Sequence, residues 1–339
     1  MDQKVRLPLE HAGPYKHYGG GPFGLEVSAL PHFADRIAAA VRRCRNPVLV
    51  GLDPRFDSLP GPLRDSADSS KPDDVAAAFR VFGRQVIDVV APLISAIKPQ
   101  AAFFEQAGPA GMQALADIIG YAHQRGLLVI VDGKRNDIGS TAAAYAQAYL
   151  GPMPASAWGA DALTVSPYLG DDSLTPFVEV AQDRGAGVFV LVKTSNPGSG
   201  LFQDLSVDGR PLYQHVGQYV DQLAAETAGA CGYGAVGGVV GATYPAQLAE
   251  LRASMPHTWF LVPGFGAQGA TARDVAGAFD HMGLGAVVNN SRGIIFAHAR
   301  KEYKERYGDQ RWQAAVEAAT LDMIDQLSSD TPAGRLAPL

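Results

Sequence analysis

The segment LLVIVDGKRNDIGSTAAAYA, residues 127–146, joins an apolar run to a group of charged residues and then to an alanine-rich stretch. The run LLVIV has the β-branched and apolar composition of a buried strand, and the alanine-rich stretch favours a helix. Between them, Asp132, Lys134 and Asp137 fall within six positions. The segment therefore predicts a strand followed by a helix, with charge concentrated where the strand ends.

The same pattern recurs along the chain. Eight apolar runs are found, at residues 47–53, 96–105, 127–134, 162–168, 187–195, 235–243, 258–266 and 285–293. Helix-favouring segments between and after them include 74–92, 110–125, 139–149, 212–229 and 296–327. Alternating strands and helices are typical of parallel βαβ units, and continuous apolar runs suit strands covered on both faces. Eight such units predict an α/β protein with a (β/α)₈ TIM barrel. An open doubly wound sheet is the lesser alternative, and its dinucleotide-binding version is weakened because no GxGxxG motif follows the first run.

We expect a single folded domain with extensions. Residues 1–30, rich in Gly, Pro and His, are interpreted as an N-terminal arm. Residues 31–330 carry the barrel, and residues 331–339 form a C-terminal tail. Residues 58–73 predict a polar loop, and no role can be derived for residues 196–211.

Composition excludes several classes of protein. The net charge is −6 and no basic run occurs, which argues against a nucleic-acid-binding protein. The two cysteines, Cys44 and Cys231, are far apart, as expected for a reduced cytoplasmic protein without a disulfide framework. No apolar run approaches the roughly 18 residues of a membrane helix. We therefore expect a soluble protein that does not associate with membranes.

Polar residues stand where the predicted strands end. They are Asp53, Lys98, the Asp132–Lys134–Asp137 group, Ser195 and the loop after the seventh run. In a (β/α)₈ barrel the carboxyl ends of all strands meet at one face, which holds the active site. Because side chains alternate along a strand, Asp132 and Lys134 are expected to point the same way, and Lys98 ends the neighbouring strand. These positions predict one shared site with a network of carboxylates and ammonium groups.

A structural role for the charged group stays open. Asp132 and Lys134 could form a simple ion pair, and Asp137 could cap the helix that follows. However, the helical segment IGSTAAAYAQAY is nearly uncharged, so the group is not part of a generally solvated face.

Several segments together resemble one enzyme family. VDGKRNDIG at 131–139 is similar to the signature of orotidine 5′-phosphate decarboxylase, in its long bacterial form. The other segments that carry the resemblance are GLDPR (51–55), IKPQAAFFE (97–105), TVSPYLG (164–170), KTSNPGS (193–199), VPGFGAQGA (262–270) and VNNSRGI (288–294). The resemblance extends over residues 50–295. It implies a carbon–carbon lyase that converts orotidine 5′-monophosphate to UMP and CO₂ in pyrimidine biosynthesis, without metal or organic cofactor.

The resemblance also implies roles for the charged residues. Lys134 would protonate C6 of the pyrimidine, and Asp132 would lie beside the substrate carboxylate. Lys98 would connect the charged network to the ribose hydroxyls, which Asp53 would also hold. The reaction needs such preorganised charges because the loss of CO₂ leaves a poorly stabilised carbanion.

Further residues are assigned by the same resemblance. Asp137 and Thr141 would reach across the interface of a homodimer into the partner's site, and their i, i+4 spacing predicts one helix face. Ser195 would contact the pyrimidine, and Gln268 would bridge base and phosphate. Arg292 would bind the phosphate group, at a usual phosphate site of these barrels.

Two alternatives remain at this level. One is a Mg²⁺-dependent sugar-phosphate decarboxylase or aldolase of a related barrel, against which Lys98 argues because a cation there would repel the metal. The other is an inactive barrel that only binds nucleotides, against which Asp132, Lys134 and Asp137 argue.

Overall fold

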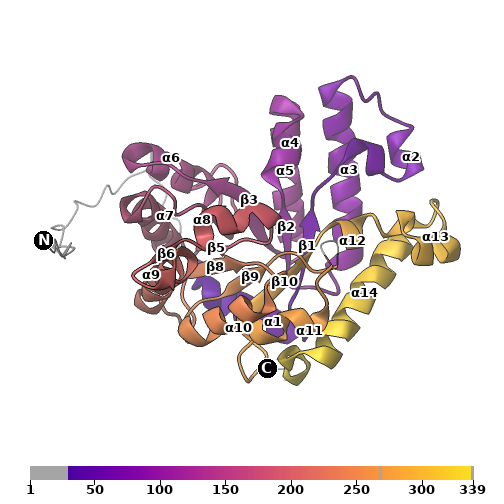
Figure 1. Cartoon of the computed structure of the whole chain (residues 1–339). Coiled ribbons are helices and arrows are strands. Elements are labelled where there is room, and N and C mark those ends of the chain that lie inside the picture. The colour runs from indigo at the N-terminus through magenta and orange to yellow at the C-terminus, as the bar shows by residue number, and fades with distance from the viewer. Residues whose placement is uncertain (1–29, 267–268, 337–339) are drawn as a thin grey trace, which may run out of the picture.

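The computed structural model is a closed barrel of parallel strands (Figure 1). The structure describes residues 30–266 and 269–336. The predicted arm at 1–30 therefore lies almost wholly outside the described residues. Around the barrel the strands follow the order β1-β10-β9-β8-β5-β4-β3-β2, so each pairs with its neighbours in the chain and β1 closes on β10. This arrangement confirms the predicted (β/α)₈ barrel.

Each barrel strand coincides with one of the eight apolar runs. The strands are β1 (Val48–Leu52), β2 (Ala96–Pro99), β3 (Leu128–Arg135), β4 (Ala162–Val165), β5 (Gly187–Lys193), β8 (Val236–Val240), β9 (Phe260–Val262) and β10 (Ala286–Asn290). Every residue of β1, β8 and β10 is buried. Such burial is expected for strands with side chains on one face filling the barrel and on the other contacting helices.

Helices cover the outside of the barrel. The longer ones are α1 (Phe33–Cys44), α3 (Pro72–Val90), α5 (Gly108–Gln124), α6 (Gly139–Tyr149), α7 (Asp171–Arg184), α9 (Leu212–Glu226), α10 (Pro245–Ser254) and α14 (Trp312–Asp330). The shorter ones are α2 (Gly61–Arg64), α4 (Ala101–Glu105), α8 (Gly200–Gln203), α11 (Ala272–Val275), α12 (Arg292–Ile295) and α13 (Lys301–Tyr307). Single 3₁₀ turns are η1 (Phe56–Ser58), η2 (Pro197–Ser199), η3 (Ala276–Ala278), η4 (Ala297–Ala299) and η5 (Pro332–Arg335).

Two predicted segments are divided in the structure. The run 96–105 is strand only as far as Pro99 and continues as α4, whose Phe104 is buried against the core. The helical segment 296–327 is interrupted after α13, where Gly308 takes a positive φ of 64° that favours glycine and ends the helix. The expected polar loop at 58–73 contains the short helix α2.

Helix α1 was not among the predicted helices, and it packs against the barrel close to β5. Phe33 meets the ring of Phe189 edge-on, with centroids 5.9 Å apart. A Cβ atom at Gly187 would lie 2.2 Å from the Phe33 ring, so this approach requires glycine. Arg36 extends from α1 to the buried carboxylate of Asp161, which also accepts hydrogen bonds from His123 and the Val129 N–H. These contacts fix α1 at the amino-terminal ends of the strands.

Residues 196–211 form a small compact excursion between β5 and α9. It consists of η2, α8 and the hairpin of β6 (Ser206–Val207) and β7 (Arg210–Pro211). The two turn residues, Asp208 and Gly209, both have positive φ, as a tight hairpin of this type requires. Residues 196–211 therefore have regular secondary structure, whereas the sequence alone assigned them no role.

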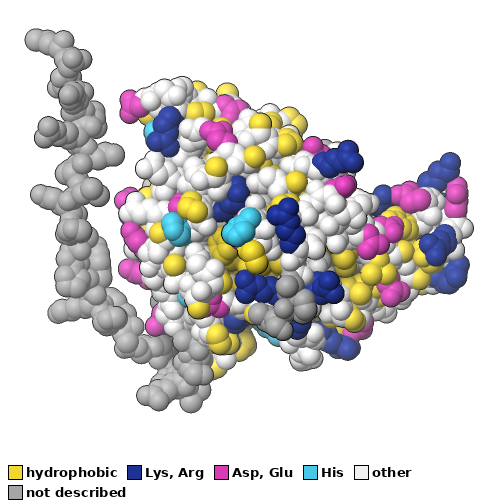
Figure 2. Space-filling view, turned by 90° about the horizontal axis from the view of Figure 1, so that it is seen from below, with side chains coloured by type: hydrophobic (Ala, Val, Ile, Leu, Met, Phe, Trp, Pro, Cys, Tyr) yellow, Lys and Arg dark blue, Asp and Glu magenta, His cyan; other side chains and the backbone are white. Residues whose placement is uncertain are grey.

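The C-terminal part packs on the body of the protein. Helix α14 ends at Asp330, and η5 follows with Ala333 and Leu336 buried. No helix among residues 30–266 and 269–336 is long and apolar enough to cross a membrane. On the face shown in Figure 2, basic and acidic side chains are interspersed with hydrophobic ones. This face lacks the continuous basic surface typical of nucleic-acid binding.

Candidate active site

Asp132, near the end of β3, is the centre of a network of side chains. Its Oδ2 accepts hydrogen bonds from Lys98 Nζ at 2.8 Å and Gln100 Nε2 at 2.9 Å. Its Oδ1 accepts from Lys134 Nζ at 2.6 Å and Thr164 Oγ1 at 2.9 Å. Burial opposes ionisation, but the attraction of Lys98 and Lys134 outweighs it and lowers the pKa of the Asp132 carboxyl far below its usual value. Asp132 is therefore a fixed negative charge.

Lys98 supplies the buried positive charge of the network. It lies on β2, beside β3, and only 4% of its side chain is exposed. Burial alone would lower the pKa of this ammonium group, but Asp132 and then Asp53 stabilise its charged form and raise the pKa. The structure thus brings together three of the predicted residues, Lys98, Asp132 and Asp53, from adjacent strands. The Oδ1 atom of Asp53 is buried and has no hydrogen-bond partner in the described part of the chain.

Lys134 is the accessible cation of the network, with 47% of its side chain exposed. Its backbone has a φ of +45°, a left-handed conformation that is strained for a lysine. The register between β3 and β4 shifts between Val131 and Arg135, and the N–H of Lys134 donates to Thr164 Oγ1 at 2.9 Å. The predicted contact of Lys134 with Asp132 is present, but it occurs in an irregular end of β3 and not in a regularly alternating strand. Bulges that redirect a side chain are common beside active sites.

Two residues of the network were not predicted. Gln100 follows β2 and forms an isolated bridge with Asp132, and Thr164 lies on β4, the other neighbour of β3. Both lie inside the predicted runs, at 96–105 and 162–168, and not at their ends. Nothing in the sequence indicated which polar residue at each strand end faces Asp132.

Asp137 lies outside this network. Its Oδ1 accepts a hydrogen bond from the N–H of Ile138 at 2.8 Å. Ile138 is the N-cap residue of α6 and its backbone is extended, so the alternative in which Asp137 caps this helix does not hold. The helix begins only at Gly139, so Asp137 and Thr141 do not share a helix face as their spacing predicted. Thr141 is exposed in the first turn of α6, and Ile138 is also exposed.

The remaining predicted residues surround the same end of the barrel. Ser195 follows β5, and its carbonyl accepts a hydrogen bond from Thr243 Oγ1 at 3.1 Å. Arg292 begins α12 directly after β10 and is exposed. Gln268 lies outside the described residues.

The junction of β1 and β10 contains further polar atoms without partners. Within the described residues, Asn289 Oδ1, Asn290 Oδ1 and Ser291 Oγ are buried and form no hydrogen bond. A Cβ atom at Gly51 would lie 2.7 Å from Ser291 Cβ and 3.0 Å from Asn289 Oδ1, so only glycine permits this approach. Buried polar atoms usually have a partner. These atoms therefore suit a polar ligand or water at this end of the barrel.

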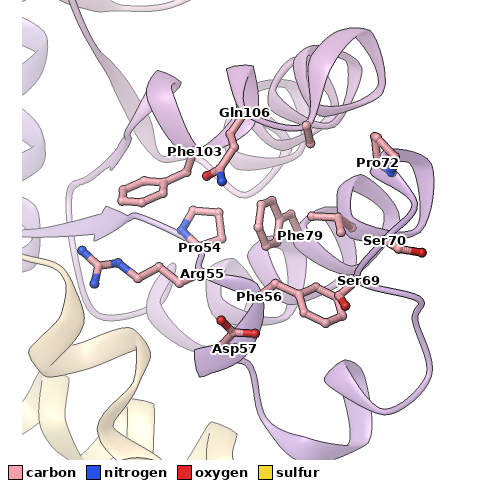
Figure 3. Close-up of a pocket in the computed structure, with 12 residues that line it drawn as sticks. Pro54, Arg55, Phe56, Asp57, Ser69, Ser70, Pro72, Phe79, Phe103 and Gln106 are labelled. Atoms are coloured by element: carbon pink, nitrogen blue, oxygen red, sulfur yellow. The ribbon is translucent and has the colours of Figure 1, made fainter.

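Two cavities have Phe103 in their lining. One, of about 410 Å³, is lined by Gln100, Ala102, Phe103, Glu105, Gly133, Lys134 and Arg135 and so opens beside the charged network. The other, of about 370 Å³, is shown in Figure 3, where Phe103, Pro54 and Arg55 stand at one side. The Arg55 guanidinium lies 5.5 Å from the centre of the Phe103 ring. Lys98, Asp132 and Lys134 do not line this second cavity, so the chemistry is assigned to the first.

Comparisons with known proteins agree with this geometry. The sequence model of the orotidine 5′-phosphate decarboxylase / HUMPS family matches residues 74–307. A protein of Rhodopirellula baltica named orotidine 5′-phosphate decarboxylase is 59% identical over 297 residues, which cover 87% of this chain and 98% of the relative. The protein of that name from Deinococcus radiodurans is 43% identical, over 79% of this chain and 90% of the relative. The structure is also similar to that of Leishmania donovani OMP decarboxylase, with a TM-score of 0.68 and 33% identity over 88% of this chain and 98% of the other.

Proposed function

The chain belongs to the orotidine 5′-phosphate decarboxylase / HUMPS family, and we propose on this basis that it converts orotidine 5′-monophosphate to UMP and CO₂. One observation connects the proposal to particular atoms. The ammonium group of Lys134 is held 2.6 Å from the carboxylate of Asp132 at the carboxyl end of β3, beside an open cavity. This is the end of the barrel at which such enzymes bind their substrates.

The proposed reaction uses Lys134 as the acid. The bond between C6 and the substrate carboxylate breaks, CO₂ leaves, and the electron pair stays on C6. A proton from Lys134 Nζ then forms the new C6–H bond of UMP. Asp132 orients this ammonium group by accepting its hydrogen bond, and it lies beside the position proposed for the substrate carboxylate. The ammonium group of Lys134, held in place by Asp132, needs little reorganisation as negative charge develops on C6, and preorganised positive charge of this kind stabilises a carbanion.

We propose that no metal or organic cofactor takes part. The support is the hydrogen bonding of Asp132. Its two carboxylate oxygens already accept hydrogen bonds from the ammonium groups of Lys98 and Lys134. A divalent cation that used the same carboxylate would have to displace one of these positive charges or lie against both.

The ribose and phosphate are assigned to residues on neighbouring strand ends. Asp53 and Lys98 are proposed to hold the ribose hydroxyls, which is supported by the buried Oδ1 of Asp53, an atom with no hydrogen-bond partner among the described residues. Arg292 is proposed to bind the phosphate, where its exposed guanidinium could form two parallel hydrogen bonds. Ser195 would contact the pyrimidine, and Gln268 would bridge the base and the phosphate.

A homodimer with shared sites is also part of the proposal. Asp137 and Thr141 would act in the partner's site, which is supported by the exposure of Thr141 and of the neighbouring Ile138. Large apolar side chains are exposed on the segments after β3 and β4, namely Ile138, Tyr168 and Leu169. Neighbouring exposed apolar residues are typical of a protein–protein interface. Both cysteines are free, which supports a reducing, cytoplasmic location.

The decisive experiment follows the absorbance of orotidine 5′-monophosphate as it is converted to UMP, with and without exhaustive chelation. We expect equal turnover in both samples. Turnover that chelation abolishes and Mg²⁺ restores would contradict the cofactor-free reaction and favour a metal-dependent enzyme of a related barrel. Binding of UMP without release of CO₂ would instead indicate an inactive nucleotide-binding barrel.

A further inference from the structure

The excursion formed by residues 196–211 contacts the end of β5 through an ion pair that the proposed reaction does not use. Lys193, the last residue of β5, is fully buried. Its Nζ donates to Asp204 Oδ1 at 2.5 Å, and Asp204 directly follows α8 in the excursion. The ammonium group also lies 4.7 Å from the ring centre of Tyr244 and 5.3 Å from that of Tyr213. Aromatic faces stabilise a cation, but among the described residues only Asp204 forms a salt bridge with it.

The direction of Lys193 results from an irregularity in the strand. Leu191 pairs with Val239 and Lys193 pairs with Val240, so Val192 is an additional residue in β5. A bulge of this kind changes the face to which the following side chain points. The ammonium group consequently lies among Asp204, Tyr213 and Tyr244.

Thr194, the residue after Lys193, is also hydrogen-bonded to the excursion. The backbone N–H of Thr194 donates to Gln203 Oε1 at 3.0 Å, and Gln203 Nε2 donates to Thr194 Oγ1 at 2.8 Å. Residues 193 and 194 are thus both held by consecutive residues of the excursion, 204 and 203.

The next residue along the chain is Ser195, which the proposed function places against the pyrimidine. A Cβ atom at Gly241 would lie 2.8 Å from both Cα and Cβ of Ser195, so the serine backbone is packed closely against β8's end. Thr243 holds the serine carbonyl, and the Gly241 N–H donates to the Lys193 carbonyl at 2.7 Å. The excursion holds one side of this short segment and the loop after β8 holds the other.

We propose that the Lys193–Asp204 ion pair is a latch, which keeps residues 196–211 closed on the end of β5 and thereby positions Ser195. Lys193 and Asp204 are positioning residues, because they act on the substrate only through Ser195. The second half of this inference rests on the proposed function, and the first half does not. If the excursion moved away, the ammonium group of Lys193 would lose Asp204, the one carboxylate with which it forms a salt bridge among the described residues. The ion pair therefore favours the closed arrangement.

The latch can be tested without any activity measurement. Thermolysin cleaves before large apolar residues, and Leu201, Phe202 and Leu205 of the excursion are exposed. We expect Asp204→Asn to be cleaved between residues 200 and 206 at least about fivefold faster than the wild type, since opening becomes more frequent. The matched control is Asp208→Asn, at the exposed hairpin turn of the same excursion, which should be cleaved at the wild-type rate. Asp204 is about half exposed, so its replacement should leave the barrel folded.

The positioning of Ser195 is tested by kinetics. In Asp204→Asn we expect kcat/KM for orotidine 5′-monophosphate to fall roughly tenfold, mainly through KM, because an interaction with bound pyrimidine is weakened. In a Ser195→Ala background the same substitution should have almost no further effect, because the group that it positions is already absent. A general loss of folded protein would instead lower kcat in both backgrounds alike.

The outcomes separate the two halves of the inference. Equal cleavage of Asp204→Asn, Asp208→Asn and wild type would overturn the latch. Faster cleavage together with independent losses from Asp204→Asn and Ser195→Ala would overturn the positioning of Ser195. If the wild type releases no CO₂ at all, the proposed function fails, and the cleavage rates alone then decide whether the latch exists.

Discussion

At the scale of single residues, Asp132 has four side-chain donors that come from β2, β3, β4 and the residue after β2. Two of these donors carry positive charge and the other two are neutral. The carboxylate thus has partners on both oxygens while most of its surface is buried. The fold stabilises the ionised form of this carboxyl group. The stability of the protein at low pH therefore depends on the hydrogen bonds of the site.

We expect this connection to appear in the pH dependence of unfolding. The pKa of Asp132 is lowered in the folded protein, whereas a free aspartate has a pKa of about 3.9. The ionised carboxyl therefore contributes stability above the unfolded-state pKa, and this contribution is lost as the pH falls through the folded-state value. The free energy of unfolding of Asp132→Asn should lie below that of the wild type at pH 7, and the difference should shrink below about pH 5. Urea unfolding from pH 7 to pH 3 measures it, and a difference that stays constant would contradict the expectation.

At the scale of elements, some contacts between a strand and a helix are so close that only glycine fits. A Cβ atom at Gly187, the first residue of β5, would lie 2.2 Å from the Phe33 ring of α1. Gly120, by contrast, is an exposed residue inside α5, and apart from its chain neighbours and its own helix backbone no described atom lies within 4 Å of the position of its Cβ. Replacement of glycine by alanine should therefore change the free energy of unfolding in opposite directions at the two positions.

Gly187→Ala should lower the free energy of unfolding by about 1–3 kcal/mol, because the added methyl group overpacks the contact between α1 and β5. Gly120→Ala should raise it by up to about 1 kcal/mol through helix propensity. Chemical denaturation of both variants checks these signs, and Phe33→Leu in the Gly187→Ala background should restore part of the loss. An unchanged free energy of unfolding in Gly187→Ala would show that α1 can shift to accommodate the methyl group and would contradict this prediction.

The elements also show what could be read from the sequence. All eight strands coincide with apolar runs because burial on both faces leaves a continuous signal, and the charged ends of β2 and β3 were placed correctly. Helix α1 was missed because it precedes the first strand, although Phe33, Ile37 and Val41 repeat with a helical period. Gln100 and Thr164 could not be identified, since the alternation rule assumes a regular strand and β3 is irregular at Lys134. The contact of Lys193 with Asp204 depends on the path of a loop, which periodicity does not describe.

At the scale of the whole molecule, the proposed homodimer makes each active site depend on two chains. Lys134 would act in its own chain and Asp137 in the partner's site. Lys134→Ala and Asp137→Ala homodimers should then each be nearly inactive, because every site lacks one of the two groups.

Mixing the two variants provides the test. After dissociation and random reassembly, half of the dimers are heterodimers, and each carries both lesions in one site and an intact second site. Activity should therefore recover to about one quarter of the wild-type value. Measured turnover that stays at the level of the separate variants, in samples shown to contain heterodimers, would contradict the role of Asp137 across the interface.

The exposure of Lys134 has a consequence for repeated turnover. In the proposed reaction each molecule of UMP leaves with a proton from Lys134, so the amine must regain one before the next substrate reacts. Lys98 lies on the other side of Asp132 and is almost completely buried, and water could not readily return a proton to it. Lys134 has nearly half of its side chain in contact with solvent, so its amine can be protonated again by bulk water once the product has left. The two lysines share one carboxylate, and only the one open to solvent can be used more than once.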